Sequence, residues 1–414
     1  MNLPFFIARR YLLRQKGTFS SFIIRMAIVA TCLSVAVMIV AMAFINGFKH
    51  TISEKMFGFL GHVHVELYDP NHTAYLDFKP IEGDKELAKA IKATPHVHQV
   101  APFALRPAIL RANGEMEGIQ LKGVNQDFRF APSMSKVGKI DYSDSAYSRQ
   151  ILLSQTTADR LKVKEGDTLQ LYFLESGGSL PRIRKVQVAG LYHTGVEEID
   201  KFYAVCDLRL LQRINGWQPG QINGYQVDCD DPKNMYAVNN SIHDYLNTPK
   251  YAGKSSLESF ILPDIYPSVF EWLNLQDVNG KIILTIMSIV AIINLAAALM
   301  ILIVDQSRMI GMMKTLGMNA GNMRQIFLYY SGLIAGAGIL AGNLLGLGVC
   351  ALQQHTGFLK LDEDTYYMKY VPVRYSWGEI AVIDIATLVL CIVCMWLPTL
   401  YIRRILPAKV LQFK

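Results

Sequence analysis

The sequence is poor in charge and in cysteine. Charged residues make up 18% of the 414 residues, and cysteine occurs six times. A soluble domain usually carries about 25% charged residues, so this chain differs from an ordinary soluble protein. Six cysteines over this length also exclude a small scaffold held together by disulfides. P-loop, G-x-S-x-G and H-E-x-x-H patterns are absent. We therefore predict no catalytic residue and no ATP hydrolysis by this chain alone.

Long apolar runs are what the sequence has instead. Hydrophobic residues make up 51% of the chain, and a helix needs about 20 mostly apolar residues to cross a bilayer. The first run is longer than the apolar core of a signal peptide and no cleavage site follows it, so we expect an uncleaved anchor. Four segments are long enough, and we predict transmembrane helices at 26–48, 281–304, 324–352 and 380–402.

The stretch between the first two predicted helices has ordinary globular composition. We assign residues 49–280 to one large domain. The predicted fold class is a membrane α-helical protein with four transmembrane helices and a large α+β domain inserted between helices 1 and 2. The other segments are short: an amphipathic stretch at 1–25, a helix at 305–323, a loop at 353–379 and a tail at 403–414.

The basic residues are unevenly distributed. The net charge is +7, which by itself would be compatible with nucleic-acid binding. However, the segments 1–25, 305–325 and 403–414 together hold twelve basic residues and one acidic residue, whereas the rest of the chain holds 29 and 33. Basic residues near the ends of membrane spans mark the cytoplasmic side. We therefore expect both termini in the cytoplasm, the 49–280 domain outside it, and no nucleic-acid partner.

Local patterns within the large domain alternate between strand and helix. The pair Asn113-Gly114 between two β-rich runs predicts a hairpin. Ser154, Asp207 and Asp231 are placed to cap helices. An α+β domain follows, with one or two subdomains. Strands are expected at 62–68, 100–111, 116–124, 168–174, 182–190 and 202–206, and helices at 86–94, 154–161, 208–214 and 232–246.

Histidines and cysteines give only weak site predictions. Two H-x-H pairs, at 62–64 and 96–98, each place two imidazoles on one face of a strand. Neither cysteine nor carboxylate completes a ligand set beside them, so we predict no metal site. Cys206 and Cys229 both belong to the large domain. A disulfide between them and two buried free thiols are both compatible with the sequence.

The last two predicted spans contain unusual residues. Asp384 is close to the outer end of the fourth span, where we expect it to be hydrated. Glycines in the third span leave room for another helix to approach closely, either within the chain or from a second copy. They form two series with four-residue spacing, Gly332–Gly336 and Gly338–Gly342–Gly346.

A short apolar stripe follows the second predicted span. Met309, Met312, Met313 and Leu316 recur at helical spacing in the segment SRMIGMMKTLGM, which spans 307–318. An exposed apolar stripe on a short cytoplasmic helix indicates contact with a protein or with the membrane surface. Methionine suits a protein groove that changes shape, because its side chain is flexible.

Seven segments, taken in order, are similar to one family. They are IARRYLLRQK (7–16), INGFKHTISEKMFGFLGHVHV (45–65), LKGVN (121–125), LLSQTTADRLKVKEGD (152–167), VAGLYHTGVEEID (188–200), SRMIGMMKTLGM (307–318) and ILPAKVLQF (405–413). On these segments the chain resembles the four-span ABC permeases of the MacB/FtsX superfamily, and among them the lipoprotein-releasing LolC/LolE type. The similarity covers nearly the whole sequence.

This resemblance implies a permease subunit that extracts lipoproteins from the outer leaflet of the bacterial inner membrane. A separate LolD-like ATPase would bind ATP and Mg, so this chain would be neither an enzyme nor the carrier of a cofactor. A second permease, identical or a paralogue, would complete a homodimer or a heterodimer. A LolA-like chaperone is a further implied partner. The large domain would be periplasmic, with a MacB-like core and a second subdomain.

The resemblance also implies roles for particular residues. The ATPase would bind a coupling helix at Arg308, Met309, Met312, Met313, Lys314, Leu316 and Gly317. The acyl chains of the cargo would lie between the first two spans, at Val40, Phe44, Phe48, Ile282 and Ile286. The chaperone would contact Gly177, Gly178 and Pro181.

The same superfamily offers two other functions. One is a MacB-like exporter of a peptide, toxin or drug. The other is an FtsX-like mechanotransmitter that controls a cell-wall hydrolase. Members of the second kind usually have a smaller external domain and lack the tail that contains Pro407 and Ala408, so we favour lipoprotein release.

Overall fold

The protein is described here by a computed structural model with two compact units. The structure describes residues 6, 19–68, 79–130, 138–144, 146–173, 181–251, 257–361, 368, 370–394 and 396. The first unit, here called the helical unit, comprises Met1–His50, Trp272–Lys360 and Tyr370–Lys414. The second, the sheet unit, comprises Thr51–Glu271 and Leu361–Lys369.

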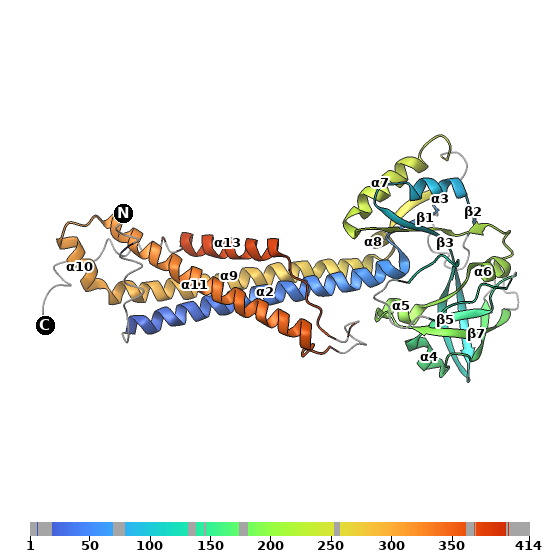
Figure 1. Cartoon of the computed structure of the whole chain (residues 1–414), viewed down its shortest axis with the longest axis horizontal. Helices are drawn as coiled ribbons and strands as arrows, with labels where there is room; N and C mark the ends of the chain where they lie inside the picture. The colour runs from blue at the N-terminus through green and yellow to red at the C-terminus, as the bar shows by residue number, and fades with distance from the viewer. Residues whose placement is uncertain are drawn as a thin grey trace. The chain divides into compact units, whose positions relative to one another are not determined.

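Long helices dominate the helical unit (Figure 1). Within the described residues, three helices are long and apolar enough to cross a membrane: Ser21–Leu60, Pro267–Asp305 and Gly321–Thr356. They belong to α2 (Phe19–Leu60), α9 (Pro267–Asp305) and α11 (Ala320–Thr356). A fourth apolar helix, α13, is described from Trp377 to Cys394. Most of 395–402, the end of the predicted fourth span, lies outside the described residues, as do nearly all of 1–18 and the tail.

The helices of this unit are held together by apolar side chains and by glycine. A buried cluster brings Ile24 of α2, Leu299 of α9, Phe327 of α11 and Cys391 of α13 together. α11 also crosses α2 so closely that a Cβ on Gly342 would lie 2.8 Å from the carbonyl oxygen of Cys32 and from Val35 Cβ. The series Gly338–Gly342–Gly346 therefore packs within the chain. A Cβ on Gly332 or Gly336 would meet no atom within 4 Å.

Asp384 has a polar partner on another helix. Asn343 of α11 donates a hydrogen bond from Nδ2 to Asp384 Oδ2 of α13, at 2.7 Å. The other carboxyl oxygen of Asp384 is buried. α11 thus supplies a polar partner that cannot be read from the sequence of the fourth span alone, and the expected hydration of Asp384 stays a prediction.

One sheet organises the second unit. In the described residues it has nine strands in the order β11-β1-β10-β3-β4-β8-β5-β7-β6. Because β6 also pairs with β3, the six strands from β3 to β6 close into a barrel, and β10, β1 and β11 extend the sheet from β3. The strands of this sheet are β1 (Val63–Leu67), β3 (Val97–Ala112), β4 (Glu115–Val124), β5 (Gln150–Ser154), β6 (Thr168–Phe173), β7 (Arg182–Tyr192), β8 (Tyr203–Asp207), β10 (Gly224–Cys229) and β11 (Leu257–Ile261).

Helices and a small second sheet complete this unit. The short strands β2 (Ile81–Glu82) and β9 (Gln221–Ile222) pair with each other. The helices are α3 (Lys85–Lys92), α4 (Gln155–Leu161), α5 (Glu197–Phe202), α6 (Leu208–Asn215), η1 (Pro232–Asn234), α7 (Met235–Leu246) and α8 (Leu262–Ile265).

Local sequence signals predicted many of these elements. Strands β3 and β4 form the predicted hairpin, with Asn113 and Gly114 both at positive φ in the turn. Ser154 and Asp207 cap α4 and α6 through their side chains, as predicted. Asp231 caps a short 3-10 turn rather than α7 directly. The strands β5, β10 and β11 and the parallel pairings of β4 with β8 and β5 with β7 were not predicted.

The predicted polar candidates have structural partners. His62 Nδ1 accepts a hydrogen bond from the backbone N–H of Cys229, and His64 Nε2 donates to the carbonyl oxygen of Leu60. Cys206 and Cys229 are both free and buried, on β8 and β10. The two sequence-level alternatives for these cysteines are thereby resolved in favour of free thiols.

Candidate functional site

The predicted coupling segment forms a helix of its own. α10 spans Ser307–Thr315, between α9 and α11. Ile310 is fully buried, and Met309 and Met313 pack against the same helical cluster. Met312 and Leu316 are instead 51% and 86% exposed. The predicted methionine stripe therefore divides: two members hold α10 in place and two face outward.

The outward face of α10 is apolar with a basic edge. Arg308 is exposed one turn before Met312, and Leu316 follows one turn after it. Gly317 ends the segment at φ +85°, and Lys314 is half-buried. Because residues four apart lie on the same side of a helix, the three exposed side chains form one strip. The strip can bind an apolar groove that has acidic groups at one end.

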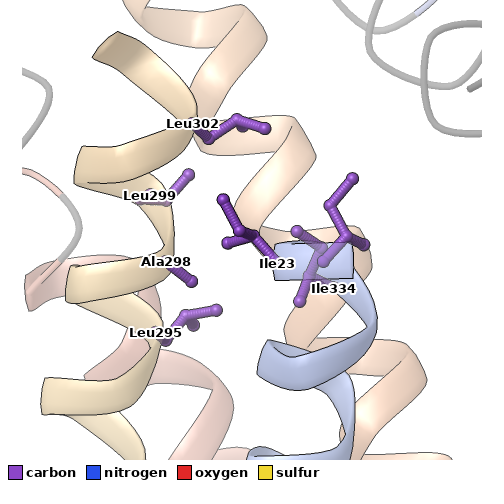
Figure 2. Close-up of a pocket in the computed structure, with 7 residues that line it drawn as sticks. Ile23, Leu295, Ala298, Leu299, Leu302 and Ile334 are labelled. Carbon is purple, nitrogen blue, oxygen red and sulfur yellow. The ribbon is translucent and has the colours of Figure 1, made fainter. Parts of the chain in front are cut away.

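A second apolar feature lies between three helices. Figure 2 shows a hollow bordered by side chains of α2, α9 and α11. Every lining residue is apolar, and the space between them is too small to admit a water molecule. The residues are Ile23, Ile24, Leu295, Ala298, Leu299, Leu302 and Ile334. None of them belongs to the predicted acyl-chain contacts.

The predicted acyl-chain residues lie on two helices that pack together. Val40, Phe44 and Phe48 of α2 are half-buried, and the Phe48 ring meets Trp272 of α9 edge-on at 5.4 Å between centroids. Lys49 of α2 and Asp277 of α9 form an ion pair at 2.5 Å. Ile282 and Ile286 of α9 are about half exposed. The outer halves of the helices are thus joined at one end, while apolar side chains of α9 stay accessible.

The segment before α13 lies across α2. Gly47 faces the carbonyl oxygen of Pro372 with no space for a Cβ. The backbone N–H of Arg374 donates to a carbonyl oxygen of α2 at 3.0 Å, and Asn46 Nδ2 donates to Glu379 Oε2 at 2.5 Å. The sequence showed Asn46 and Gly47 only as part of a similar segment, since their partners lie more than 320 residues away.

The predicted chaperone contact is described only in part. Gly177 and Gly178 lie outside the described residues. Pro181 is exposed, directly before β7.

The C-terminal end of α2 is held by groups of the sheet unit. Gly61 follows the helix in the left-handed region, at φ +85°. Lys122 Nζ donates to the carbonyl oxygen of Phe59 at 2.5 Å, and His64 Nε2 donates to that of Leu60 at 2.6 Å. The last carbonyls of a helix lack partners within the helix and carry partial negative charge. Two side-chain donors therefore satisfy and neutralise this helix end.

Lys122 is buried in an apolar setting. Its residue is 2% exposed, and Nζ also donates to Gln226 Oε1 at 2.7 Å. The ammonium lies 5.0 Å from the ring centroid of Phe59 and 4.9 Å from that of Phe128. Burial lowers the pKa of Lys122 to about 7, and the nearby Asp228 acts in the opposite direction. The two rings stabilise the cationic form through their π-electrons.

His62 is the second buried ionisable group near this end. Its ring stacks on Phe57 of α2 with 4.4 Å between centroids. Burial lowers the pKa of His62 to about 4, against smaller opposing effects of Asp231 and Asp230. Because Nδ1 accepts from the N–H of Cys229, a proton on that atom would place two donors face to face. The fold therefore requires the neutral ring.

An aromatic cluster surrounds the same helix end. The Phe59 ring lies 5.5 Å from Tyr203, 5.7 Å from Tyr192 and 6.1 Å from Phe130. The hydroxyl groups of Tyr203 and Tyr266 are hydrogen-bonded, and Tyr266 directly precedes α9. These surroundings of the α2 end were not predicted from the sequence. Their only signal was a lysine within the apolar strand segment IQLKGV, 119–124.

Comparison with known families decides the classification. Residues 26–245 match the family model for the MacB-like periplasmic core domain, and residues 281–407 match the FtsX-like permease C-terminal model. This chain belongs to the MacB/FtsX family of permeases. It is therefore a membrane permease with a MacB-like periplasmic domain.

Two relatives of this MacB/FtsX permease match it from end to end. The lipoprotein-releasing system transmembrane protein LolE of Haemophilus influenzae is 26% identical, over 100% of both chains. The protein named LolC of Neisseria meningitidis serogroup B is 25% identical, also over 100% of both chains. A solved structure of the periplasmic region of MacB from Actinobacillus actinomycetemcomitans matches 50% of this chain and 91% of its own, at 11% identity and a TM-score of 0.36.

Proposed function

We propose that this MacB/FtsX permease extracts lipoproteins from the outer leaflet of the bacterial inner membrane as a subunit of an ABC transporter. The observation that carries the proposal is the full-length similarity to proteins named as transmembrane parts of a lipoprotein-releasing system. Similarity that covers both the membrane helices and the external domain supports the same task for the whole chain, since a shared domain alone would fit other exporters equally well.

The driving force would come from a separate ATPase subunit. The sequence has no P-loop, so ATP and Mg would be bound by that partner. The strip formed by Arg308, Met312 and Leu316 on α10 is the surface we assign to it. Met309 and Met313 would support the strip from behind, and Lys314 and the exposed Gly317 would lie beside it.

The cargo would bind from the side, through the membrane. Its acyl chains would contact the accessible apolar side chains Ile282 and Ile286 of α9, next to Val40 and Phe44 of α2. Removing an acyl chain from lipid costs about 0.8 kcal/mol per CH₂ group. Passive binding would not release such a load, and this explains the need for ATP hydrolysis.

The remaining features of the assembly follow from charge and length. The fourth span would continue from α13 to about residue 402. The distribution of basic residues would then place both termini in the cytoplasm. A second permease, identical or paralogous, would complete the membrane part. A LolA-like periplasmic chaperone would receive the lipoprotein near residues 175–181.

Depletion of the chain in its own bacterium tests the proposal. Mature lipoproteins should accumulate in the inner membrane, measured by membrane fractionation and immunoblotting. Normal lipoprotein sorting together with lost export of a peptide or drug would instead establish the exporter. Normal sorting together with a defect in cell separation would establish the mechanotransmitter.

A further inference from the structure

Lys122 is a buried cation that neither the ATPase-docking surface nor the cargo contacts use. Both of its hydrogen-bond acceptors are neutral oxygens, the carbonyl of Phe59 and the side-chain amide of Gln226. Burying an ammonium group is costly, and an unbranched apolar side chain of similar length would fill the same space without that cost. What an apolar side chain cannot supply is a directional bond to the end of a helix.

The three groups joined by Lys122 come from three different elements. Phe59 belongs to the last turn of α2, Lys122 to strand β4 of the barrel, and Gln226 to strand β10 of the sheet extension. Gln226 continues the network by donating to Asp228 Oδ1 at 3.2 Å. Its side chain also fills the space where a Cβ of Gly61 would lie. The ammonium group is therefore the common point of the helix end, the barrel and the extension.

The end of α2 continues into β1 after two residues, and His64 of β1 donates to the carbonyl oxygen of Leu60. Toward the barrel, the last turn makes aromatic contacts as well as the hydrogen bond from Lys122. The other side chains around the last turn of α2 on that side are aromatic rings. Dispersion contacts between rings have little directionality, so rings can slide past one another more easily than a hydrogen bond can be broken. Hydrogen bonds from charged donors are shorter and about twice as strong as neutral ones. A charged donor on the last turn thus resists a shift of α2 along its axis far better than the rings do.

We propose that Lys122 is a positioning residue that fixes the end of α2 to the barrel, so that a displacement of α2 moves the external domain. The proposal rests on the proposed function in one respect: it takes α2 to be displaced during the transport cycle. The structural part, that Lys122 holds the last turn of α2, does not depend on what is transported.

The first experiment tests that structural part. Amide hydrogen exchange is measured on the full-length chain in lipid nanodiscs, for the wild type and Lys122→Met. The peptide covering the last turn of α2 and Gly61 should exchange about fivefold faster in the variant, since a hydrogen bond to that turn is lost. Lys162→Met is the control, because Lys162 forms an exposed pair with Glu115, and it should leave this peptide unchanged. Unchanged exchange in Lys122→Met would overturn the proposal.

The second experiment tests positioning against mere stability. The permease and its ATPase are reconstituted in liposomes with a fluorescently labelled, acylated lipoprotein, and lipoprotein released is divided by ATP hydrolysed. Lys122→Met should lower this ratio about tenfold while ATP hydrolysis per complex and the thermal unfolding midpoint stay near the wild type. A purely structural role would lower hydrolysis and release together and leave the ratio unchanged, which would overturn the proposal.

A further variant keeps the experiment decisive if Lys122→Met fails to fold. Lys122→Gln retains a neutral donor of shorter reach. The lipoprotein released per ATP hydrolysed should therefore be lower than in the wild type, but by less than tenfold. A wild-type ratio in a folded Lys122→Gln complex would overturn the role of the charge. If the wild-type complex hydrolyses ATP but releases no lipoprotein, the proposed function fails, whereas the exchange result still decides whether Lys122 holds the helix.

Discussion

Helix α2 is held in two different ways along its length. In the helical unit its contacts with α11 are a matter of shape, since Gly338, Gly342 and Gly346 let the backbone of α11 approach Thr31 to Ala36. In the sheet unit its last turn is held by donors, from Lys122 and His64. The difference follows from the surroundings. Lipid offers apolar helices no hydrophobic driving force to associate, so close packing has to supply it, whereas a helix that ends inside a folded domain leaves carbonyl groups to satisfy.

The shape-based contact should be the least tolerant of added volume. Gly342→Leu places a side chain against the carbonyl oxygen of Cys32 and against Val35, and backbone atoms cannot move aside. We expect a loss of more than about 3 kcal/mol and little folded protein after detergent extraction, since overpacking alone costs about 1–3 kcal/mol. Size-exclusion chromatography and thermal unfolding measure this.

Gly348→Leu is the matched control for this position. Gly348 belongs to the same helix, and a Cβ at this position would meet no atom within 4 Å. The yield of folded protein should therefore stay near that of the wild type. Equal losses of folded protein in both variants would mean that the change in helix propensity, and not the contact with α2, causes the loss.

The exposed side of α10 can be tested by its binding to the ATPase. Met312→Asp puts a charge on the outward strip, so the ATPase should no longer co-purify with the permease, while folding is preserved because Met312 is 51% exposed. Tyr236→Asp, an exposed aromatic position on α7 of the sheet unit, should leave recovery of the complex unchanged. Normal recovery with Met312→Asp would show that this strip is not the docking surface.

The end of α2 in the sheet unit should respond to acid, unlike its contact with α11, because the buried His62 stacks on Phe57 of α2. His62 has a pKa of about 4 in the folded chain and about 6.5 when unfolded. Well above pH 6.5 the ring of His62 is neutral in both the folded and the unfolded chain. As the pH falls from 6.5 to 4, the unfolded chain gains a proton that the folded chain cannot accept, so the fold loses up to about 3 kcal/mol.

Urea unfolding followed by the fluorescence of Trp217, the single tryptophan between residues 51 and 271, measures this loss. His62→Asn keeps an acceptor near the N–H of Cys229 but does not titrate. It should therefore unfold with a smaller decline between pH 6.5 and 4. An identical decline in both proteins would assign the acid sensitivity to other groups.

The smallest of these effects concerns the residue after α2. Gly61→Ala should cost about 2 kcal/mol, because Gly61 has φ +85° and Gln226 occupies the place of its Cβ. Gly166→Ala separates the two causes, since Gly166 has φ +93° and a Cβ at that position would meet no atom within 4 Å. Urea unfolding should give a lower free energy of unfolding for Gly61→Ala than for Gly166→Ala. Equal losses would mean that backbone strain accounts for the whole effect.

Several particular features could be predicted from local signals. The hairpin at Asn113-Gly114 and the caps at Ser154 and Asp207 were found because each depends on residues within a few positions of one another. The neutral partner of Asp384 was missed, since Asn343 lies 41 residues away on another helix. The apolar stripe of α10 was predicted, but its buried and exposed members were not distinguished. The spacing of residues shows which of them share one side of a helix, but it does not show what that side contacts.

The class of this protein can be read from the amino-acid sequence without a structure: it has apolar runs long enough for a bilayer, basic residues at the ends of those runs, and no ATP-binding motif. These properties follow from composition and order, which need no folding to be read. Three other features became apparent from the folded chain: one glycine series packs against α2, β6 pairs with β3 to close a barrel, and Lys122 donates to the end of α2. Each joins residues that are distant in sequence, and burial of such groups is a property of the packed chain alone.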